Sequence, residues 1–278
     1  MFRGRGRKII TTLAPIILVV LVVALGVPLA AYLLQDHLIF LPRPLAGVEQ
    51  RAIAARHPEA GDVFLEAADG TRLHAWHVTA AAQAPLVLYF GGNAEEVSWL
   101  LDELPRRQTG AAWLLVDYRG YGASAGTPSE RALSEDALLW YDYAAKSAPR
   151  LYAAGRSLGS GVAVRLAAER RLDGLMLITP FDSMVAVGAR HYPFLPVRAL
   201  LRHRFDSLEL APRIAAPLLC IAATQDDIIP AAHARRLYDA WQAPKRWVAL
   251  AAGHNTIDEH PDYWPSMRAF LDARRINR

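Results

Sequence analysis

Short, wholly apolar runs recur along most of the chain, and they are the main guide to its fold. Each comprises four or five residues, and they lie at residues 86–90, 113–116, 151–154, 175–178, 218–222 and 247–250. Runs of this length and composition are typical of strands buried on both faces of a parallel sheet. Two further strands, 63–67 and 73–78, flank Asp69-Gly70, a dipeptide that favours a hairpin turn. We therefore expect a hairpin followed by a mostly parallel sheet of about eight strands.

Amphipathic segments separate these runs and predict the helices that flank the sheet. The best-marked one begins at Thr127-Pro128-Ser129-Glu130, which has the pattern of a capping box with proline at the first helical position, and extends to about Lys146. Further helices are expected at residues 157–170, 231–241 and 261–275. Alternating strands and helices indicate an α/β fold with helices on both faces of the sheet.

A different pattern occupies the N-terminus, where the 26 residues from Ile9 to Leu34 carry no charge. A helix of this length would measure about 39 Å, enough to cross a hydrocarbon core of ~30 Å, although Pro15 and Pro28 could shorten the continuous helix. The run is longer than the apolar part of a signal peptide and lacks a good cleavage context. We therefore predict a retained transmembrane anchor over residues 9–34, in preference to a cleaved signal peptide or a buried helix.

Charge refines this organisation. The net charge is +4, and four positive residues, Arg3, Arg5, Arg7 and Lys8, precede the anchor. Residues 1–8 should thus form a cytoplasmic basic tail, with the body of the protein on the opposite, extracytoplasmic side of the membrane. The remainder of the chain is balanced in charge, which argues against a nucleic-acid partner. Residues 35–62, rich in proline and glycine, should form a connector to a single domain over residues 63–278. The lone cysteine, Cys220, lies in an apolar run and is predicted to be a core residue.

The clearest candidate for chemistry is Ser157, within Gly155-Arg156-Ser157-Leu158-Gly159. This G-x-S-x-G pattern follows a predicted strand and opens a predicted helix, which is the context of a nucleophile elbow. Such a turn holds the serine in a strained backbone conformation, and its flanking glycines avoid collisions with the neighbouring strand and helix. The alternative is a glycine-rich turn whose serine merely caps the helix.

A serine nucleophile needs a base, which in turn needs an orienting acid. Of the nine histidines, His254 is best placed, directly after the last predicted strand. The loop after the penultimate strand offers Asp226 and Asp227, and spacing alone leaves both open; Asp258 is a weaker rival. The backbone N–H groups of Leu158 and of Asn93, in a glycine turn after the third strand, are the predicted oxyanion donors.

Taken in order, these motifs resemble those of the membrane-anchored α/β-hydrolase-domain serine hydrolases. The matching segments include residues 89–94, 117–122, 127–130, 155–159, 226–230 and 253–255, so the resemblance covers nearly the whole chain. It implies the α/β-hydrolase fold and places the catalytic acid at Asp226. Two departures stand out: Gly91-Gly92-Asn93 replaces the usual His-Gly-Asn, which puts the usual support of that loop in doubt, and Ala223 replaces a glycine.

The expected activity is hydrolysis of a carboxylic ester or thioester, from a lipid or acylated substrate near a membrane, through an acyl-serine intermediate. A serine exopeptidase or amidase, and a catalytically inactive membrane-tethered binding protein, are the alternatives. No metal or cofactor is expected, since no set of His, Asp or Glu has ligand spacing. A short lid is expected around residues 180–216; its apolar residues, among them Tyr192 and Phe194, could form an acyl-binding wall or ordinary helix packing.

Overall fold

The computed structural model describes the backbone of residues 3–273 and the side chains of residues 18–273. Within this part of the chain, one eight-stranded sheet has the order β1-β2-β4-β3-β5-β6-β7-β8. The strands are β1 (Ala60–Glu66), β2 (Arg72–Val78), β3 (Leu86–Phe90), β4 (Ala112–Asp117), β5 (Leu151–Arg156), β6 (Gly174–Ile178), β7 (Leu218–Ala223) and β8 (Lys245–Leu250). β2 is antiparallel to both β1 and β4, and every other pair is parallel. The predicted hairpin and mostly parallel sheet are confirmed.

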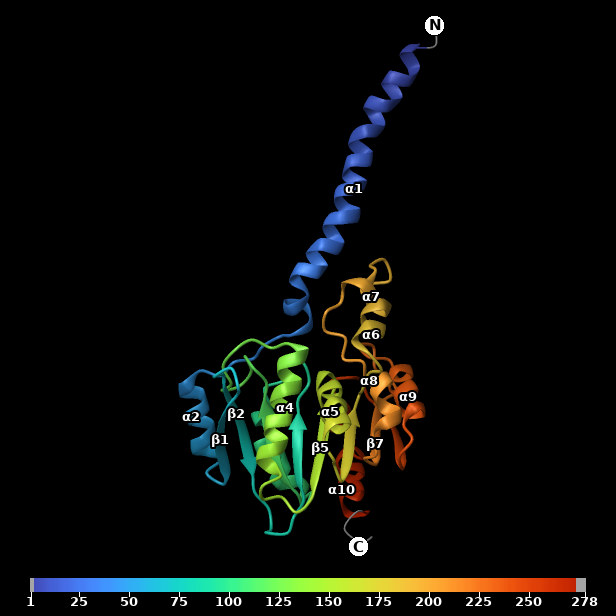
Figure 1. Ribbon diagram of the computed structural model, residues 1–278. Helices are drawn as coiled ribbons and strands as arrows, with labels where there is room; N and C mark the ends of the chain where they lie inside the picture. The colour runs from blue at the N-terminus through green and yellow to red at the C-terminus, as the bar shows by residue number, and fades with distance from the viewer. Residues whose placement is uncertain (1–2, 274–278) are drawn as a thin grey trace.

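Helices cover both faces of the sheet, which explains why its central strands are apolar throughout (Figure 1). On one face lie α4 (Glu130–Ala144), α5 (Leu158–Glu169) and α9 (Ala231–Ala240). On the other lie α2 (Gly47–Arg56), α3 (Leu100–Arg107) and α10 (Tyr263–Ala273). Each set packs into its own apolar core, so the sheet has two buried sides and the central strands have no polar face.

Three local features differ from the sequence-based expectation. The predicted connector contains α2, because Pro44 and Pro58 flank this helix instead of interrupting it. Helix α3 was not predicted because it contains Pro105; three buried leucines at residues 100, 101 and 104 hold it against the sheet. The capping box is also wrong: the N-cap of α4 is Ser129, whose Oγ accepts from the N–H of Ala132. Pro128 therefore precedes the helix.

The N-terminal helix, α1 (Arg3–Ile39), is continuous, and neither Pro15 nor Pro28 ends it. Within it, Leu18–Ile39 has a mean hydropathy of 2.4 and is long and apolar enough to cross a membrane. Figure 1 shows α1 projecting away from the domain. The predicted basic tail, residues 1–8, lies outside the part of the chain whose side chains are described. The helix continues beyond the predicted end of the anchor at Leu34, so its last turn belongs to the folded body.

The segment where a lid is expected contains three short helices: α6 (Met184–His191), α7 (Val197–Leu200) and α8 (Ser207–Leu210). Helices α6 and α7 project from the domain on the same side as α1 (Figure 1). The carboxylate of Glu130, at the start of α4, accepts from the backbone N–H groups of Arg204 and Phe205. This side chain therefore holds the segment that leads from α7 to α8. Its place in the predicted capping box did not indicate this role.

Candidate active site

Ser157 occupies the turn between β5 and α5, with backbone angles of φ 51° and ψ −115°. This left-handed conformation is strained for any residue other than glycine. The two glycines of the motif are required for steric reasons: a Cβ at Gly155 would overlap the carbonyl oxygen of Gly159, and a Cβ at Gly159 would overlap that of Phe90. The turn can therefore form only with glycine at both flanks, and it presents the Ser157 hydroxyl at the carboxyl edge of the sheet.

Two further side chains complete a hydrogen-bonded chain with Ser157. The Oγ of Ser157 lies 2.9 Å from Nε2 of His254, and Nδ1 of His254 lies 2.7 Å from Oδ2 of Asp226. His254 and Asp226 are buried. They follow β8 and β7, so the parallel sheet brings together residues that are up to 97 positions apart. In this arrangement the serine proton can pass to the imidazole while the carboxylate holds the ring.

The other Asp226 oxygen fixes the acid in place. Oδ1 accepts from the backbone N–H groups of Ile228 and Ile229, at 3.0 and 2.7 Å. Neighbouring Asp227 is exposed, and Asp258 lies 3.4 Å from the guanidinium of Arg156. Of the three candidate acids, the structure brings Asp226 alone into contact with His254.

Backbone N–H groups lie close to Ser157 on two sides. Leu158 is the first residue of α5, so its N–H has no acceptor within the helix. On the other side, a Cβ at Gly92 would lie 3.6 Å from Cβ of Ser157, which brings the glycine turn against the serine. Asn93 in that turn lines the same cavity as Ser157 and Leu158. A carbonyl oxygen held above Ser157 would thus have amide donors within reach.

Comparison with known proteins agrees with a hydrolase site of this kind. A family model for serine hydrolases matches residues 140–273. The uncharacterized protein Rv2307c of Mycobacterium tuberculosis is 39% identical over 249 residues, covering 87% of this chain and 88% of that protein. The chain belongs to the α/β-hydrolase-domain serine hydrolases.

Two further matches agree with this assignment, one by sequence and one by fold alone. The lysophosphatidylserine lipase ABHD12 of Danio rerio is 31% identical over 225 residues, covering 63% of this chain and 57% of that protein. The esterase PF2001 of Pyrococcus furiosus has the same fold, with a TM-score of 0.63 at 18% identity, covering 84% of this chain and 97% of that structure. The predicted α/β-hydrolase fold and the assignment as a serine hydrolase are therefore confirmed.

The sequence left open what supports the glycine turn at Gly91, and the structure shows these supports. The carboxylate of Glu95 accepts from the N–H of Gly92 at 2.5 Å. Its other oxygen accepts from the hydroxyl of Tyr89 and the indole N–H of Trp99, at 2.9 and 3.1 Å. Sequence reasoning missed Glu95, because an acidic residue in a loop carries no local sign of these contacts.

Residues on the loop after β4 support the same turn. The hydroxyl of Tyr118 donates to the carbonyl of Gly91 at 2.9 Å, and that of Tyr121 donates to Oδ1 of Asn93 at 2.8 Å. Burial, together with the Glu95 carboxylate, raises the pKa of Tyr118 well above its usual value. Burial also raises the pKa of Tyr121 to about 12. Both hydroxyls therefore stay protonated and remain donors at any ordinary pH.

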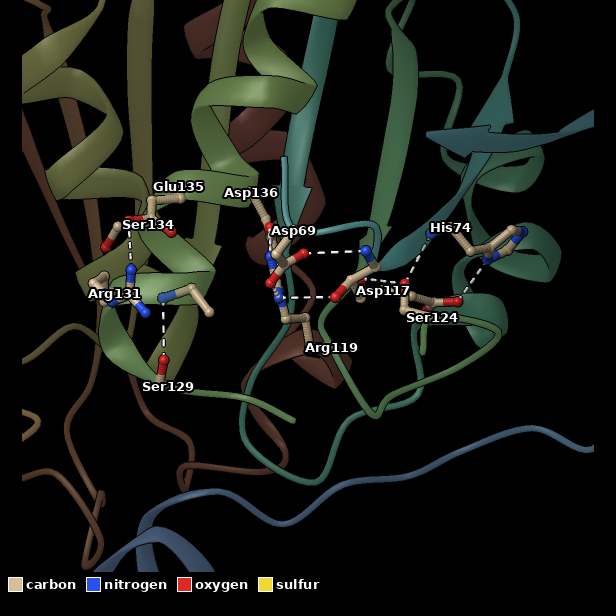
Figure 2. Close-up of polar contacts among 12 residues, drawn as sticks. Asp69, His74, Asp117, Arg119, Ser124, Ser129, Arg131, Ser134, Glu135 and Asp136 are labelled. Atoms are coloured by element: carbon tan, nitrogen blue, oxygen red, sulfur yellow. Dashed lines mark hydrogen bonds and ion pairs between the residues drawn. The ribbon is translucent and has the colours of Figure 1, made fainter. Parts of the chain in front are cut away.

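Charged side chains, most of them buried, hold that loop in shape through hydrogen bonds (Figure 2). Arg119 forms two hydrogen bonds with Asp136, at 2.7 and 2.8 Å, and also pairs with Asp69 in the hairpin turn. Its hydrogen bonds hold the pKa of Asp69 well below the usual range. Beside it, Asp117 contacts Nδ1 of buried His74 at 2.6 Å and accepts from a backbone N–H of the loop. This network therefore holds the loop that carries Tyr118 and Tyr121.

The Asn93 side chain faces away from the catalytic serine, toward the end of α1. Its Nδ2 donates to the carbonyl of Ile39 at 2.8 Å, and its Oδ1 accepts from the N–H of Leu41 at 2.9 Å. The side chain of Asn93 therefore ties the glycine turn to the N-terminal helix, while its backbone N–H is the part available to a substrate. Contacts across more than 50 residues leave no signal in the local sequence.

A cavity of about 700 Å³ rises from the site. Ser157, Leu158 and Asn93 lie at its base, and its walls come from α1 and from α6 and α7. Polar side chains are few in this lining, so the cavity suits an apolar ligand.

The other reactive side chains have different surroundings. Cys220 is buried in β7, where burial raises the pKa of its thiol, so it is a core residue as predicted. His233 on α9 is buried against Asp182, which also binds Arg236. Among the described residues, no group of three or more His, Cys, Asp or Glu side chains could hold a metal ion.

Proposed function

We propose that this hydrolase cleaves the carboxylic esters or thioesters of lipids or other acylated molecules, through an acyl-serine intermediate. The observation that carries the proposal is the Ser157–His254–Asp226 hydrogen-bonded chain at the base of an apolar cavity. The lysophosphatidylserine lipase among its relatives supports a lipid ester as the substrate class.

The reaction follows from the geometry. Nε2 of His254 takes the proton of Ser157 as Oγ attacks the carbonyl carbon, and Asp226 stabilises the imidazolium. The N–H groups of Asn93 and Leu158 hold the negative oxygen of the tetrahedral intermediate. His254 then gives its proton to the leaving alcohol or thiol. In the second half, water attacks the acyl-serine with His254 again as the base, and the acid is released.

The location of the site relative to a membrane is part of the same proposal. Helix α1 would cross the bilayer, with the N-terminal basic residues on the cytoplasmic side and the catalytic domain on the opposite side. Its support is the apolar stretch Leu18–Ile39 and the four positive residues before the charge-free run.

Labelling with a fluorophosphonate tests the proposed nucleophile. The wild-type chain should be labelled and should hydrolyse p-nitrophenyl acetate, whereas Ser157→Ala should do neither. Ser147→Ala, at an exposed serine away from the site, is the control and should behave as wild type. Equal labelling of wild type and Ser157→Ala would defeat the assignment. Faster cleavage of aminoacyl anilides than of p-nitrophenyl acyl esters would instead favour an amidase.

A further inference from the structure

We propose that the acyl chain of the substrate enters the site sideways from the bilayer, through a slot between α1 and the connection of α6 to α7. The inference deepens the proposed function and rests on it. It makes the N-terminal helix a wall of the active site as well as an anchor, and it identifies the substrate as a long-chain ester resident in the membrane.

One wall of the slot is a single face of α1. The aliphatic lining residues there include Val27, Ala30, Ala31, Leu34 and Leu38, and Gln35 is the polar residue of α1 in the lining. Successive members are separated by one, three or four positions, so they share one face of the helix. Apart from Gln35 near its end, that face is aliphatic, and the two alanines leave room for a chain to lie against the helix. The cavity continues from this face to Ser157.

The opposite wall comes from the lid. Tyr192, Phe194 and Leu195 line the same cavity, and the rings of Tyr192 and Phe194 pack edge to face with centroids 6.3 Å apart. Phe194 is nevertheless 73% exposed and Tyr192 49% exposed. These two rings therefore do not pack in the core. Ordinary helix packing, one of the two roles expected for them from the sequence, does not describe them. Exposed aromatic clusters of this kind mark surfaces that contact a partner or a membrane.

The polar residues at the end of α1 indicate where the bilayer surface lies. The charge-free run ends at Leu34, and the next two residues bind the segment that follows α7. Oδ1 of Asp36 contacts Arg202 and His203 at 2.9 and 2.7 Å, and Oε1 of buried Gln35 accepts from the N–H of Arg202 at 2.7 Å. These contacts form a polar belt that fixes α1 to the lid at the level where the apolar run stops.

The part of this wall from Val27 to Leu34 lies on the membrane side of the belt. From Val27 to Leu34 the helix rises by about 10 Å, and one leaflet of the hydrocarbon core is ~15 Å thick. The slot therefore faces the acyl chains of the leaflet nearer the catalytic domain. Helices α6 and α7 project beside this part of α1 (Figure 1), which carries Phe194 toward the same leaflet.

An acyl chain accounts for the slot better than a protein partner does. The slot leads without interruption to Ser157, and its volume of about 700 Å³ suits a single small ligand. With the ester carbonyl at Ser157, the chain would extend along α1 into the leaflet from which it came. After the ester C–O bond breaks and water completes the hydrolysis, the fatty acid remains in the leaflet, and the alcohol leaves on the aqueous side.

Tryptophan substitutions on two faces of α1 test the wall. Ala30→Trp and Ala31→Trp place a large ring in the slot, whereas Leu29→Trp places it on a face that does not line the cavity. The full chain, reconstituted in phosphatidylcholine vesicles, is assayed with p-nitrophenyl palmitate and p-nitrophenyl acetate. The wall variants should lose at least about tenfold in kcat/KM for palmitate because the ring overpacks the slot. Acetate hydrolysis, and both activities of Leu29→Trp, should stay within about twofold of wild type.

The outcomes separate the two proposals. Unchanged palmitate hydrolysis in Ala30→Trp and Ala31→Trp, or an equal loss in Leu29→Trp, would overturn sideways entry while leaving the ester hydrolase intact. A wild-type chain that hydrolyses neither ester, or a Ser157→Ala variant that hydrolyses both, would overturn the proposed function itself.

A depth measurement tests the lid independently of activity. In Phe194→Cys, a bimane label should attach at residue 194 because Cys220 is buried. Gln242→Cys is the control, since it lies in the exposed turn before β8, at the opposite end of the sheet from Ser157. Lipids spin-labelled in their acyl chains should quench the bimane at residue 194 and not at residue 242. Equally weak quenching at both positions would contradict immersion of the lid.

Discussion

Replacing Asp226 by asparagine isolates the orienting role that we assign to this acid. The two side chains have nearly the same shape, and asparagine Oδ1 can still accept from the N–H groups of Ile228 and Ile229. Its other end, however, becomes an NH₂ group facing Nδ1 of His254 across 2.7 Å. Two N–H donors cannot face each other, so the imidazole must place its proton on Nε2. The ring then donates toward Ser157 and can no longer take the serine proton.

The expected loss is large and confined to the chemical step. A wrong histidine tautomer lowers kcat by about 10⁴-fold when the equivalent aspartate of a chymotrypsin-like serine protease is replaced by asparagine. That factor corresponds to about 5.5 kcal/mol of transition-state stabilisation. KM should change little because Asp226 does not line the cavity. With both backbone bonds kept, stability should fall by no more than about 1 kcal/mol.

The assay is steady-state hydrolysis of p-nitrophenyl acetate, with thermal unfolding measured on the same samples. Asp227→Asn is the matched control: its carboxylate is exposed, so the variant should keep wild-type kcat. A folded Asp226→Asn enzyme with kcat within tenfold of wild type would refute the reasoning, as would a larger loss in Asp227→Asn. Either result would mean that something other than Asp226 sets the tautomer of His254.

Two further predictions concern the supports of the glycine turn. Glu95→Gln replaces an acceptor by an NH₂ group that faces three donors. Because the N–H of Asn93 then loses its position, kcat for esters should fall by about tenfold or more with little change in KM. An unchanged kcat would show that Tyr118 and Tyr121 suffice to hold the glycine turn. For Tyr121, burial raises the pKa from 10.0 to about 12, so the folded state holds a proton that the unfolded chain releases. The stability contributed by this group is complete below pH 10 and declines between pH 10 and 12, by up to ~1.4 kcal/mol per pH unit. In urea unfolding at a series of pH values, Tyr121→Phe should therefore show a shallower alkaline decline than wild type, and parallel curves would contradict this origin.

Much of the fold could be predicted because burial on both faces leaves a direct mark on the sequence. The central strands are apolar at every position, so runs such as residues 86–90 and 218–222 stand out without any tertiary information. Ser157 could be predicted for a similar reason: the steric limits that require Gly155 and Gly159 also fix their spacing. The same five residues therefore predict both the type of turn and the proposed nucleophile.

Contacts between distant segments could not be predicted in this way. Glu95, the side chain of Asn93 and the lining face of α1 act through neighbours that only the folded chain supplies. A local pattern also misled where packing outweighed propensity, since Pro105 lies inside α3. Spacing alone likewise left both Asp226 and Asp227 open, and only the resemblance pointed to Asp226.

The bond between Asn93 and the last residue of α1 has a practical consequence for purification. Cutting off the leader is a common way to obtain a soluble form of a single-pass protein. Here a fragment starting after Ile39 would lack the carbonyl that holds the Asn93 amide, and it would also lack one side of the acyl slot. Its kinetics and chain-length preference would describe an artificial enzyme, so meaningful substrate profiling requires the intact polypeptide in a lipid environment.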